Sequence, residues 1–279
     1  MIVDAHQHFW KIDRGDYFWM DDSVAEIRRD ILPADLLPHA NTCGVTASIA
    51  VQAAPTVAET EYLLDLAKES NLVQGVVGWV DLENAHVATT LSRLATSPDF
   101  KGIRPMLQDI EDTNWILKPN VLANLSIVSN LGLTLDALVQ PRHLATINEV
   151  ATKLPSLKIV IDHCAKPAIA GGKNTGDDWR SDMSRLADHD QIFCKLSGLA
   201  NEYGNGWSAE TLKPVFDHVM ETFGANRIMW GSDWPVLELA GTYEDWFSCA
   251  QSLASGMTKQ DRLMVFGGTA CDFYRIQLS

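Results

Sequence analysis

The chain has 279 residues, with 22 Lys and Arg against 36 Asp and Glu, so its formal net charge is −14 with neutral histidines. This balance argues against a nucleic-acid partner, because phosphate binding relies on clustered basic side chains, and it disfavours an anionic membrane surface. Apolar residues make up 46% and charged residues 21% of the chain, which is typical of a packed globular protein and not of a disordered one.

Short apolar, β-branched runs alternate along the chain with longer segments of helical periodicity, which predicts parallel strands joined by helices. In chain order, the predicted strands cover residues 2–5, 46–51, 73–80, 101–104, 133–139, 158–161, 192–196 and 227–231. Helices are predicted between them, for example over 56–70, where Thr56 and Glu59 have capping-box spacing, and over 209–223, which carries one apolar stripe. Eight strand–helix units of about 35 residues each fit a (β/α)8 TIM barrel of the α/β class, so we expect residues 1–279 to form a single domain.

The segments that follow the predicted strands are longer and more polar than those that precede them. Residues 10–31, 170–178 and 201–208 each follow a strand, whereas only 155–157 lead into the sixth. In a barrel of this kind, the loops after the strands all open on one face, where active sites are built. Candidate functional residues are therefore expected at the ends of the strands.

The start of the chain and its cysteines indicate the compartment. Met1-Ile2-Val3 is followed at once by Asp4 and His6, without a basic segment or a long apolar core, so we expect no targeting signal. The five cysteines are scattered and never form a Cys-x-x-Cys pair, which disfavours a disulfide framework and a cysteine-based zinc site. These features predict a reduced, cytoplasmic protein without a membrane span.

The first predicted strand leads into a pair of histidines, His6 and His8. Residues two apart on an extended chain point the same way, so both rings can face the barrel mouth and share a cation or an oxyanion. The alternative is a pair of histidines that bond only to the backbone. Their place at the end of the first strand favours the functional interpretation.

The sixth and eighth predicted strands also end in ionisable residues, His163 and Asp233 respectively. A carboxylate at the end of a buried strand is costly to desolvate unless it has a partner or takes part in chemistry. Asp233 is therefore the strongest single candidate, against the alternative that it only caps its own turn.

Arg104 ends the fourth predicted strand and places a guanidinium at the same face. It can hold a carboxylate or carbonyl oxygen with two hydrogen bonds, or merely neutralise Asp109 or Glu111 nearby. Other polar and aromatic residues near strand ends are candidates for lining a polyhydroxylated ligand. These are Gln52, Trp79, Lys166 and Trp10, of which Trp79 can equally cap the core.

Seven motifs, in order along the chain, are similar to those of a known family. They are Asp4-Ala5-His6-Gln7-His8-Phe9-Trp10, Val51-Gln52, Val76-Val77-Gly78-Trp79-Val80-Asp81-Leu82, Gly102-Ile103-Arg104, Asp162-His163-Cys164-Ala165-Lys166-Pro167, Cys194-Lys195-Leu196-Ser197-Gly198-Leu199 and Gly231-Ser232-Asp233-Trp234-Pro235. Together they resemble the amidohydrolase superfamily, and within it the lactonase branch of fuconolactonase, rhamnono-lactonase and pyrone-dicarboxylate lactonase types. The resemblance runs from end to end and implies a distorted (β/α)8 barrel that opens the lactone ring of a sugar acid.

The resemblance also implies roles for individual residues. His6 and His8 match the family's first-strand histidines, His163 its sixth-strand histidine and Asp233 its eighth-strand aspartate. It implies either no required cofactor or one divalent metal held by His6, His8 and Asp233, for which zinc is the first candidate from the ligand types.

Three departures from the family pattern limit what the resemblance implies. Binuclear members carry a modified lysine on the fourth strand where this chain has Arg104. Mononuclear members usually add a fifth-strand histidine, where this chain reads Leu135-Asp136-Ala137-Leu138-Val139. Fuconolactonase-like sequences tend to place His-Gln after the fourth-strand arginine, where this chain has Pro105-Met106, so the sugar acid stays open between the L-fucono and L-rhamnono types.

Lactone hydrolysis needs a base for water, a stabiliser for the oxyanion and a proton for the leaving alkoxide. We expect Asp233 to be the base and His6, His8, His163 and Arg104 to polarise the carbonyl. The expected partner is a small sugar lactone, with a homodimer left open. Three alternatives remain: a decarboxylase of the same superfamily, a lactone isomerase, and a sugar-acid binding protein without turnover.

Overall fold

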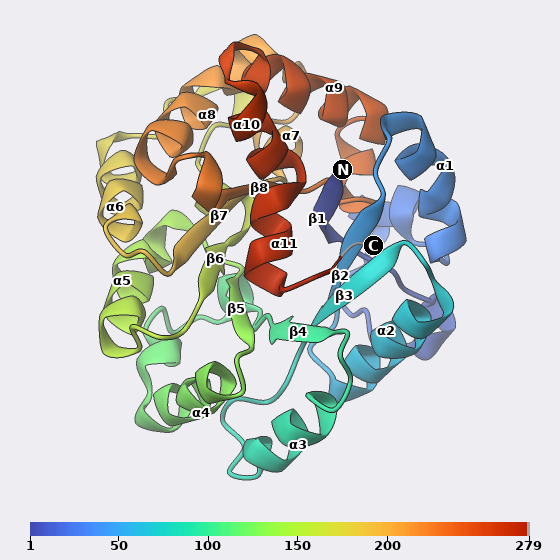
Figure 1. Ribbon diagram of the computed structural model, residues 1–279, viewed down its shortest axis with the longest axis vertical. Coiled ribbons are helices and arrows are strands. Elements are labelled where there is room, and N and C mark those ends of the chain that lie inside the picture. The colour runs from blue at the N-terminus through green and yellow to red at the C-terminus, as the bar shows by residue number, and fades with distance from the viewer. Residues whose placement is uncertain (278–279) are drawn as a thin grey trace.

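Eight parallel strands form one sheet in which strand order follows chain order (Figure 1). The computed structural model describes residues 1–277. The strands are β1 (Val3–Gln7), β2 (Ala47–Val51), β3 (Val73–Gly78), β4 (Phe100–Ile103), β5 (Thr134–Ala137), β6 (Ile159–Ile161), β7 (Ile192–Leu196) and β8 (Ile228–Trp230). The segment after β8 meets β1, where Asp233 N donates to His6 O at 2.7 Å and His8 N donates to Trp234 O at 2.8 Å. The sheet thereby closes, and the predicted (β/α)8 TIM barrel of the α/β class is confirmed.

The helices lie outside the ring of strands, most of them around its circumference and α11 across one end (Figure 1). They are α1 (Pro33–Cys43), α2 (Val57–Glu69), α3 (Val87–Leu94), α4 (Pro119–Asn130), α5 (Leu144–Lys153), α6 (Asp177–Ala187), α7 (Leu199–Tyr203), α8 (Ala209–Phe223), α9 (Tyr243–Leu253), α10 (Lys259–Leu263) and α11 (Thr269–Tyr274). The prediction for 209–223 coincides with α8, and that for 56–70 with α2 and its two flanking residues.

The predicted capping box of α2 forms only in part. Thr56 caps the helix, its Oγ1 accepting from Glu59 N at 3.0 Å. The Glu59 carboxylate instead accepts from the backbone N–H groups of Ala53 and Ala54, at 2.9 and 3.0 Å. The glutamate therefore holds the loop after β2 and does not return to the cap, because that loop passes within reach of its buried side chain.

Strand ends differ from the prediction where apolar residues continue past the hydrogen-bonded ladder. Strand β3 ends at Gly78 and β5 at Ala137, before the buried Val80 and Val139. Strand β1 continues to Gln7, beyond its predicted end at residue 5, because Gln7 still pairs with Ala50 of β2. Apolar character alone does not separate a strand from the buried segment that follows it.

A β-bulge in β1 decides which side chains face the barrel interior. Asp4 pairs with Ser48 and Gln7 with Ala50, so β1 contains one extra residue between these two pairs. A bulge of this kind re-aims the side chains that follow it. Ala5 packs in the interior cluster, and the next residue, His6, also points inward toward the mouth.

The barrel is filled from one end by apolar side chains. Helix α11 lies across the end at which the chain begins (Figure 1), and Phe273 and Tyr274 pack there against inward-facing strand residues. The strand residues in this cluster include Val3, Ile49, Val77, Val160 and Met229. The opposite end, where the strands finish, is therefore the open one.

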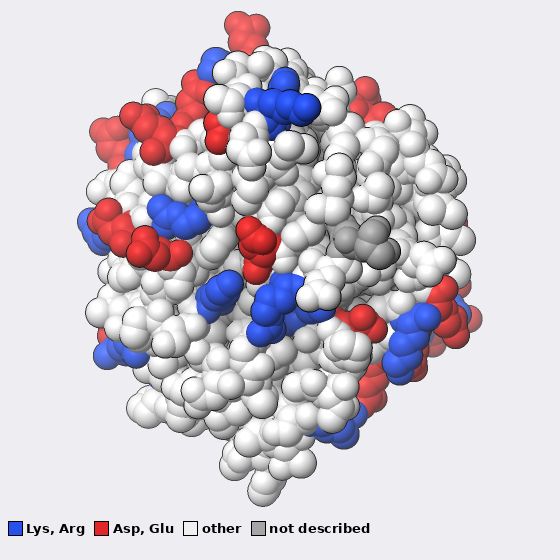
Figure 2. Space-filling model, viewed as in Figure 1, with Lys and Arg blue, Asp and Glu red and all other residues white. Residues whose placement is uncertain are grey.

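The structure shows where charged side chains lie on one face and whether the cysteines are paired. Figure 2 shows Lys and Arg side chains scattered over the face that α11 covers, with acidic groups mainly near the rim. The cysteines of the described residues are free, as predicted. Within residues 1–277, every helix is too short or too polar to cross a membrane.

Candidate active site

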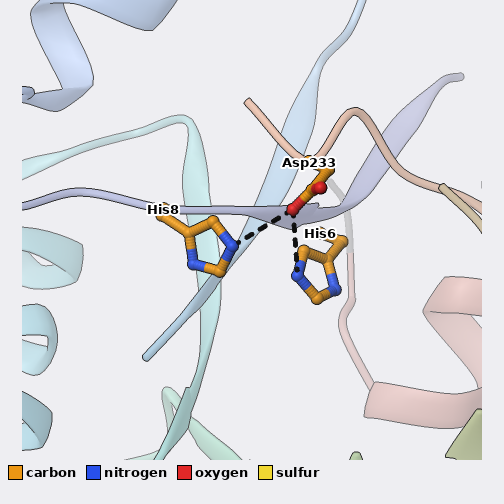
Figure 3. Close-up of side chains that lie close together, drawn as sticks. All are labelled: His6, His8 and Asp233. Carbon is orange, nitrogen blue, oxygen red and sulfur yellow. Dashed lines mark hydrogen bonds and ion pairs between the residues drawn. The ribbon is translucent and has the colours of Figure 1, made fainter. Parts of the chain in front are cut away.

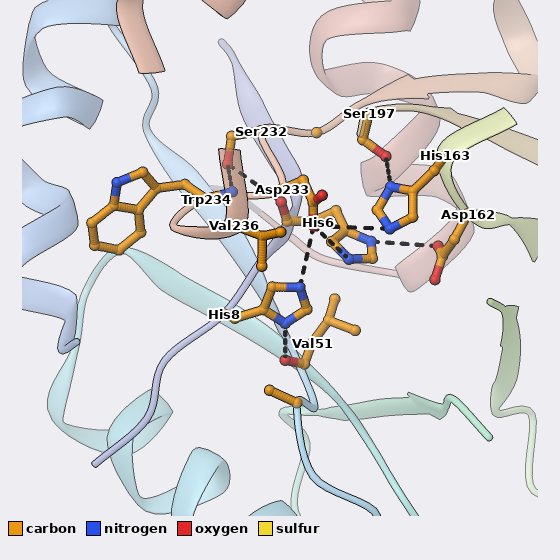
Figure 4. Close-up of polar contacts among 12 residues, drawn as sticks. His6, His8, Val51, Asp162, His163, Ser197, Ser232, Asp233, Trp234 and Val236 are labelled. Carbon is orange, nitrogen blue, oxygen red and sulfur yellow. Dashed lines mark hydrogen bonds and ion pairs between the residues drawn. The ribbon is translucent and has the colours of Figure 1, made fainter. Parts of the chain in front are cut away.

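Three histidines from two strand ends surround one oxygen of Asp233 at the open end of the barrel. Asp233 Oδ1 lies 3.3 Å from His8 Nε2, 3.6 Å from His6 Nε2 and 3.8 Å from His163 Nε2. Figure 3 shows His6 of β1 and His8, directly after β1, pointing at this oxygen, and Figure 4 adds His163 from the segment after β6. The structure thus brings together the four ionisable residues that the strand-end pattern selected.

Close packing of the backbone makes this convergence feasible. Gly231 lies directly after β8, and a Cβ built there would stand 2.7 Å from the Cβ of His6. Only glycine lets the β8 end approach β1 this closely. Gly198, after β7, has a positive φ of 68°, and a Cβ there would stand 2.6 Å from His163 Nδ1. Both glycines therefore make room for a site histidine.

The backbone at His163 and Asp233 is strained. Four successive residues, His163 to Lys166, have φ between 49° and 61°, and Asp233 has φ of 60°. Non-glycine residues rarely adopt this left-handed conformation, at a cost of order 1–3 kcal/mol each, and such residues cluster at functional sites. The left-handed turn places His163 toward Asp233 and Lys166 at the cavity wall.

Each histidine ring also has a contact at its other nitrogen. His8 Nδ1 lies 2.8 Å from Val51 O, and His163 Nδ1 lies 2.9 Å from Ser197 Oγ (Figure 4). Both nitrogens of His8 thus face acceptors, the second being Asp233 Oδ1. A neutral ring has only one N–H, so this pair of contacts calls for a further proton or a cation between His8 and Asp233.

Burial and neighbouring charges shift the protonation of the site. Burial lowers the pKa of His163 to about 4, although Asp233 and Asp162 oppose the shift, so the ring is neutral at pH 7. Burial, followed by the charge of Lys195, lowers the pKa of His6 well below its usual value. For Asp233, burial alone would raise the pKa, but in acid the surrounding protonated histidines, His163 first and then His8, outweigh it and lower the pKa below the usual range. Asp233 is therefore ionised at neutral pH.

A cavity of about 570 Å³ opens above these residues. His8, Arg104, His163 and Asp233 contribute polar atoms to its wall. Aromatic and apolar side chains make up much of the rest, including Trp19, Trp79, Met106, Ile110 and Trp115. Lys166 lies at the same wall and pairs with Glu202, Nζ to Oε1, at 3.2 Å. The cavity combines a few polar groups with aromatic faces, as sugar-sized ligands require.

Two residues expected to bind substrate do not line this cavity in the described chain. Gln52 is fully buried and donates through Nε2 to Arg104 O at 2.7 Å. Trp10 is fully buried under the loop after β1 and donates through Nε1 to Arg29 O at 2.8 Å. The other two, Trp79 and Lys166, do line it. A side chain that follows a strand can turn between neighbouring strands, which the linear pattern does not reveal.

Arg104 lines the cavity, whereas His6 lies behind its wall. Arg104 lines the cavity, donates to Gln52 O, and has NH1 3.7 Å from Asp162 Oδ2. Its ion-pair partner is therefore Asp162, so the suggested neutralisation of Asp109 or Glu111 is wrong. His6 is fully buried behind Asp233 and, among the described residues, is not part of the cavity wall.

A buried charged group beneath the mouth was missed in the sequence. Lys195 of β7, Asp136 of β5 and Asp162 after β6 are fully buried and lie close together, with Lys195 Nζ 2.5 Å from Asp136 Oδ2 and 3.1 Å from Asp162 Oδ1. Tyr274 of α11 donates to Asp136 Oδ2 at 2.6 Å. The available signal was a charged residue in the middle of a buried apolar strand, as in Cys194-Lys195-Leu196.

The donor atoms at the mouth fit a divalent metal ion. His6, His8 and Asp233 offer two nitrogens and one oxygen, all within 4.8 Å of one another. His6 Nε2 has no hydrogen-bond partner within the described residues. His8 Nε2 faces a carboxylate oxygen, although the single N–H of a neutral His8 ring is already directed at Val51 O. Two imidazoles and a carboxylate form a ligand set that zinc accepts, with positions left open for water or substrate.

Comparisons with known proteins give the family and its chemistry. The family described as Amidohydrolase matches residues 3–276. The chain is 43% identical over 278 residues to L-fucono-1,5-lactonase of Burkholderia ambifaria, across 98% of this chain and 95% of that protein. It is 32% identical over 286 residues to L-fucono-1,5-lactonase of Burkholderia multivorans, across 98% and 96% of the two chains. A crystal structure of an amidohydrolase from Burkholderia multivorans with bound zinc matches with a TM-score of 0.93 at 31% identity, over 99% of this chain and 100% of that chain.

Proposed function

The chain belongs to the amidohydrolase family, and from this membership and its site we propose that it hydrolyses the lactone ring of a sugar acid, with L-fucono-1,5-lactone as the first candidate substrate. The resemblance to the lactonase branch is confirmed by the two L-fucono-1,5-lactonases among its relatives. The chain is thus a hydrolase acting on a cyclic ester. The observation that carries the residue assignment is the convergence of three imidazoles on a single oxygen of Asp233.

That convergence supports different roles for the two oxygens of Asp233. The histidine contacts all involve Oδ1, which fixes the carboxylate and keeps it ionised. Asp233 lines the cavity, and Figure 3 shows its second oxygen, Oδ2, turned away from His6 and His8. Oδ2 is therefore the atom that accepts a proton from water as the water attacks the lactone carbonyl.

The oxyanion that forms needs donors that are in place before the reaction. Arg104 supplies a guanidinium that is held by Gln52 O and Asp162 and still lines the cavity. His163, fixed by Ser197, lines the cavity from the other side of Asp233. The proton on Asp233 then returns to the ring oxygen as the acyl–oxygen bond breaks, which yields the open hydroxy acid.

The cavity wall suits a deoxy sugar lactone. Trp19 and Trp79 present aromatic surface to C–H groups, while Lys166 offers N–H donors to hydroxyl or carbonyl oxygens. Gln52 and Trp10 act from behind this wall, the first through the Arg104 carbonyl and the second by stacking on His8 with ring centroids 6.4 Å apart.

A divalent metal, zinc first, fits His8 and Asp233, with His6 as the third donor. When bound, such an ion would polarise the lactone carbonyl as a Lewis acid. The roles of Asp233 as base and of Arg104 as oxyanion donor are the same with or without it.

Proton release in a weakly buffered pH indicator tests this function. The wild type and Asp233→Asn are assayed with freshly prepared five- and six-membered sugar-acid lactones, after subtraction of spontaneous hydrolysis. We expect fast acid production by the wild type, strongest with L-fucono-1,5-lactone, and a kcat lower by about 10²- to 10⁴-fold in the folded variant. No acid production by the wild type across the panel would contradict the function. A near-normal kcat in Asp233→Asn would contradict the base.

A further inference from the structure

Lys195 is a fully buried ammonium group in direct contact with a site histidine. It lies in β7 with no exposed surface. Its Nζ is 2.5 Å from Asp136 Oδ2, 3.1 Å from Asp162 Oδ1 and 3.1 Å from Nδ1 of His6. An ammonium group has three N–H donors and no acceptor. Asp136 and His6 each accept one of them, and Asp162 adds an ion pair.

The contact with Lys195 decides where His6 carries its proton. Because Lys195 can only donate, Nδ1 of His6 must be the acceptor, and the ring proton must then be on Nε2. Asp162 competes for the same nitrogen, since its Oδ1 lies 3.4 Å from Nδ1 and would accept a proton from it. The Lys195 contact is shorter and within hydrogen-bond range, which favours the Nε2–H form.

The Nε2–H group of His6 faces the carboxylate of Asp233. His6 Nε2 is buried and faces Asp233 Oδ1 at 3.6 Å, and within residues 1–277 no closer hydrogen-bond partner is present. Lys195, His6 and Asp233 therefore lie in a line, in which Lys195 donates to His6 Nδ1 and the Nε2–H of His6 faces Asp233 Oδ1. We propose that Lys195 is a positioning residue that fixes the Nε2–H tautomer of His6, so that His6 presents an N–H to the Asp233 carboxylate instead of offering a lone pair to a metal ion.

This arrangement puts the ring proton on Nε2, the nitrogen that a metal ion at the mouth would need as its ligand. A metal-binding imidazole donates its second N–H to a carboxylate or carbonyl, which leaves the other nitrogen free as a ligand. Asp162 is in place for that role, and Lys195 opposes it. The balance between these two neighbours sets whether His6 supports the carboxylate or binds a metal. The role of the tautomer in holding the base rests on the proposed function, whereas the tautomer itself rests on contacts alone.

Nitrogen NMR of the metal-free protein tests the tautomer directly. Protein with 15N-labelled histidine is recorded at pH 7.5 in a two- and three-bond proton–nitrogen correlation, which distinguishes Nε2–H from Nδ1–H rings. The His6 signals are those lost in His6→Gln. We expect a protonated Nε2 and an unprotonated Nδ1. A wild-type His6 with the proton on Nδ1 would overturn the proposal, whatever the variants do.

A charge-balanced variant tests the role of Lys195. Replacing Lys195 alone leaves buried carboxylates without their cation, so the variant used is Lys195→Met/Asp136→Asn, which removes one charge of each sign. We expect the His6 proton to move to Nδ1 and donate to Asp162. The matched control, Asp136→Asn, keeps Lys195 and should keep the proton on Nε2. A folded double variant with an unchanged tautomer, or a switch in the control as well, would contradict the proposal.

Zinc affinity gives a second readout that does not depend on turnover. Titration with zinc chloride should show binding about 10- to 100-fold tighter in the double variant than in the wild type, because His6 then has the outer-shell carboxylate typical of metal ligands. Equal affinity in the two proteins would contradict the proposal. Neither measurement uses a lactone, so a failure of the lactonase function would leave this result standing, and the reverse also holds.

Discussion

The strand-end layer, with His8, Arg104, His163 and Asp233, and the layer beneath it, with Asp136, Lys195 and Tyr274, are both built from buried polar side chains. In the lower layer, Asp136 Oδ2 accepts hydrogen bonds from both Lys195 and Tyr274. In the upper layer, Arg104 Nε has no partner among the described residues, and His8 and Asp233 bring two acceptors together.

The difference indicates that the two layers serve stability and ligand binding separately. A fully paired buried group is costly to disturb and fixes the geometry around it. Polar atoms left without partners are available to a ligand. His6 lies between the two layers and contacts Lys195 on one side and Asp233 on the other. Changes in the lower layer should therefore act mainly on stability, and changes in the upper layer mainly on turnover.

The largest effect on stability is expected from Lys195→Met, which leaves Asp136 without its buried cation and Asp162 with only the more distant Arg104. Breaking such a pair costs about 3–5 kcal/mol in free energy of unfolding, measured by urea denaturation. The control Lys213→Met removes an exposed lysine that pairs with Asp217 on α8, and it should leave the unfolding curve unchanged. Similar curves for the two variants would show that the lower layer does not carry stability.

In acid, His163 of the upper layer should lower the free energy of unfolding, because its buried ring resists protonation. Burial lowers the pKa of His163 to about 4, against about 6.5 in the unfolded chain. Between these values the unfolded state binds more protons, so this contribution to the free energy of unfolding is present above pH 6.5 and is lost as pH falls. Between pH 7 and pH 5, the free energy of unfolding of the wild type should fall by about 2 kcal/mol more than that of His163→Gln, as measured by urea denaturation.

The control for this pH effect is His86→Gln, at an exposed position before α3, where the wild-type pH dependence should persist. If His163→Gln followed the wild-type curve between pH 7 and pH 5, His163 would not be the neutral, buried ring that the upper layer contains.

Ser197→Ala sharpens the comparison from within the upper layer, because it removes only the hydroxyl that contacts His163 Nδ1. The lost hydrogen bond should lower kcat for the lactone by about tenfold, with little change in KM. Ser48→Ala removes a buried hydroxyl in β2 that bonds Gln7 and Leu72, away from the cavity. Equal kcat values for the two variants would mean that the orientation of His163 does not matter for turnover.

The smallest effect is expected at the cavity wall. Trp79→Ala removes an aromatic face that lines the cavity, and KM should rise by about threefold to tenfold while kcat stays close to the wild-type value. Trp207→Ala removes a half-buried tryptophan outside the cavity wall and should leave KM unchanged. A large fall in kcat for Trp79→Ala would place Trp79 beside the reacting atoms and not at the outer wall of the cavity.

The barrel and its mouth were predictable because they follow from local patterns. Period-two alternation at a strand end places His6 and His8 on one side, and a carboxylate such as Asp233 in a buried turn is conspicuous. The lower layer was not predicted, because Lys195 and Asp136 lie inside apolar runs and only the closed barrel brings them together. The β1 bulge depends on its pairing with β2, and that pairing decides which β1 side chains face inward.

The positions of Gln52 and Trp10 show the limit of reasoning from strand ends. Both follow a strand, but neighbouring segments capture their polar atoms, the Arg104 carbonyl in one case and the Arg29 carbonyl in the other. Which side chain reaches the cavity is decided by contacts between distant segments, and these require the folded chain.

The most direct test of the account makes the same change, Asp to Asn, in each layer and measures kcat for L-fucono-1,5-lactone together with the free energy of unfolding. Asp233→Asn is expected to lower kcat by about 10²- to 10⁴-fold and to unfold near the wild-type urea concentration. Asp136→Asn is expected to unfold at lower urea and to keep kcat within about tenfold of wild type. A near-normal kcat in folded Asp233→Asn, with the larger loss in Asp136→Asn, would contradict the assignment of the chemistry to the strand-end layer.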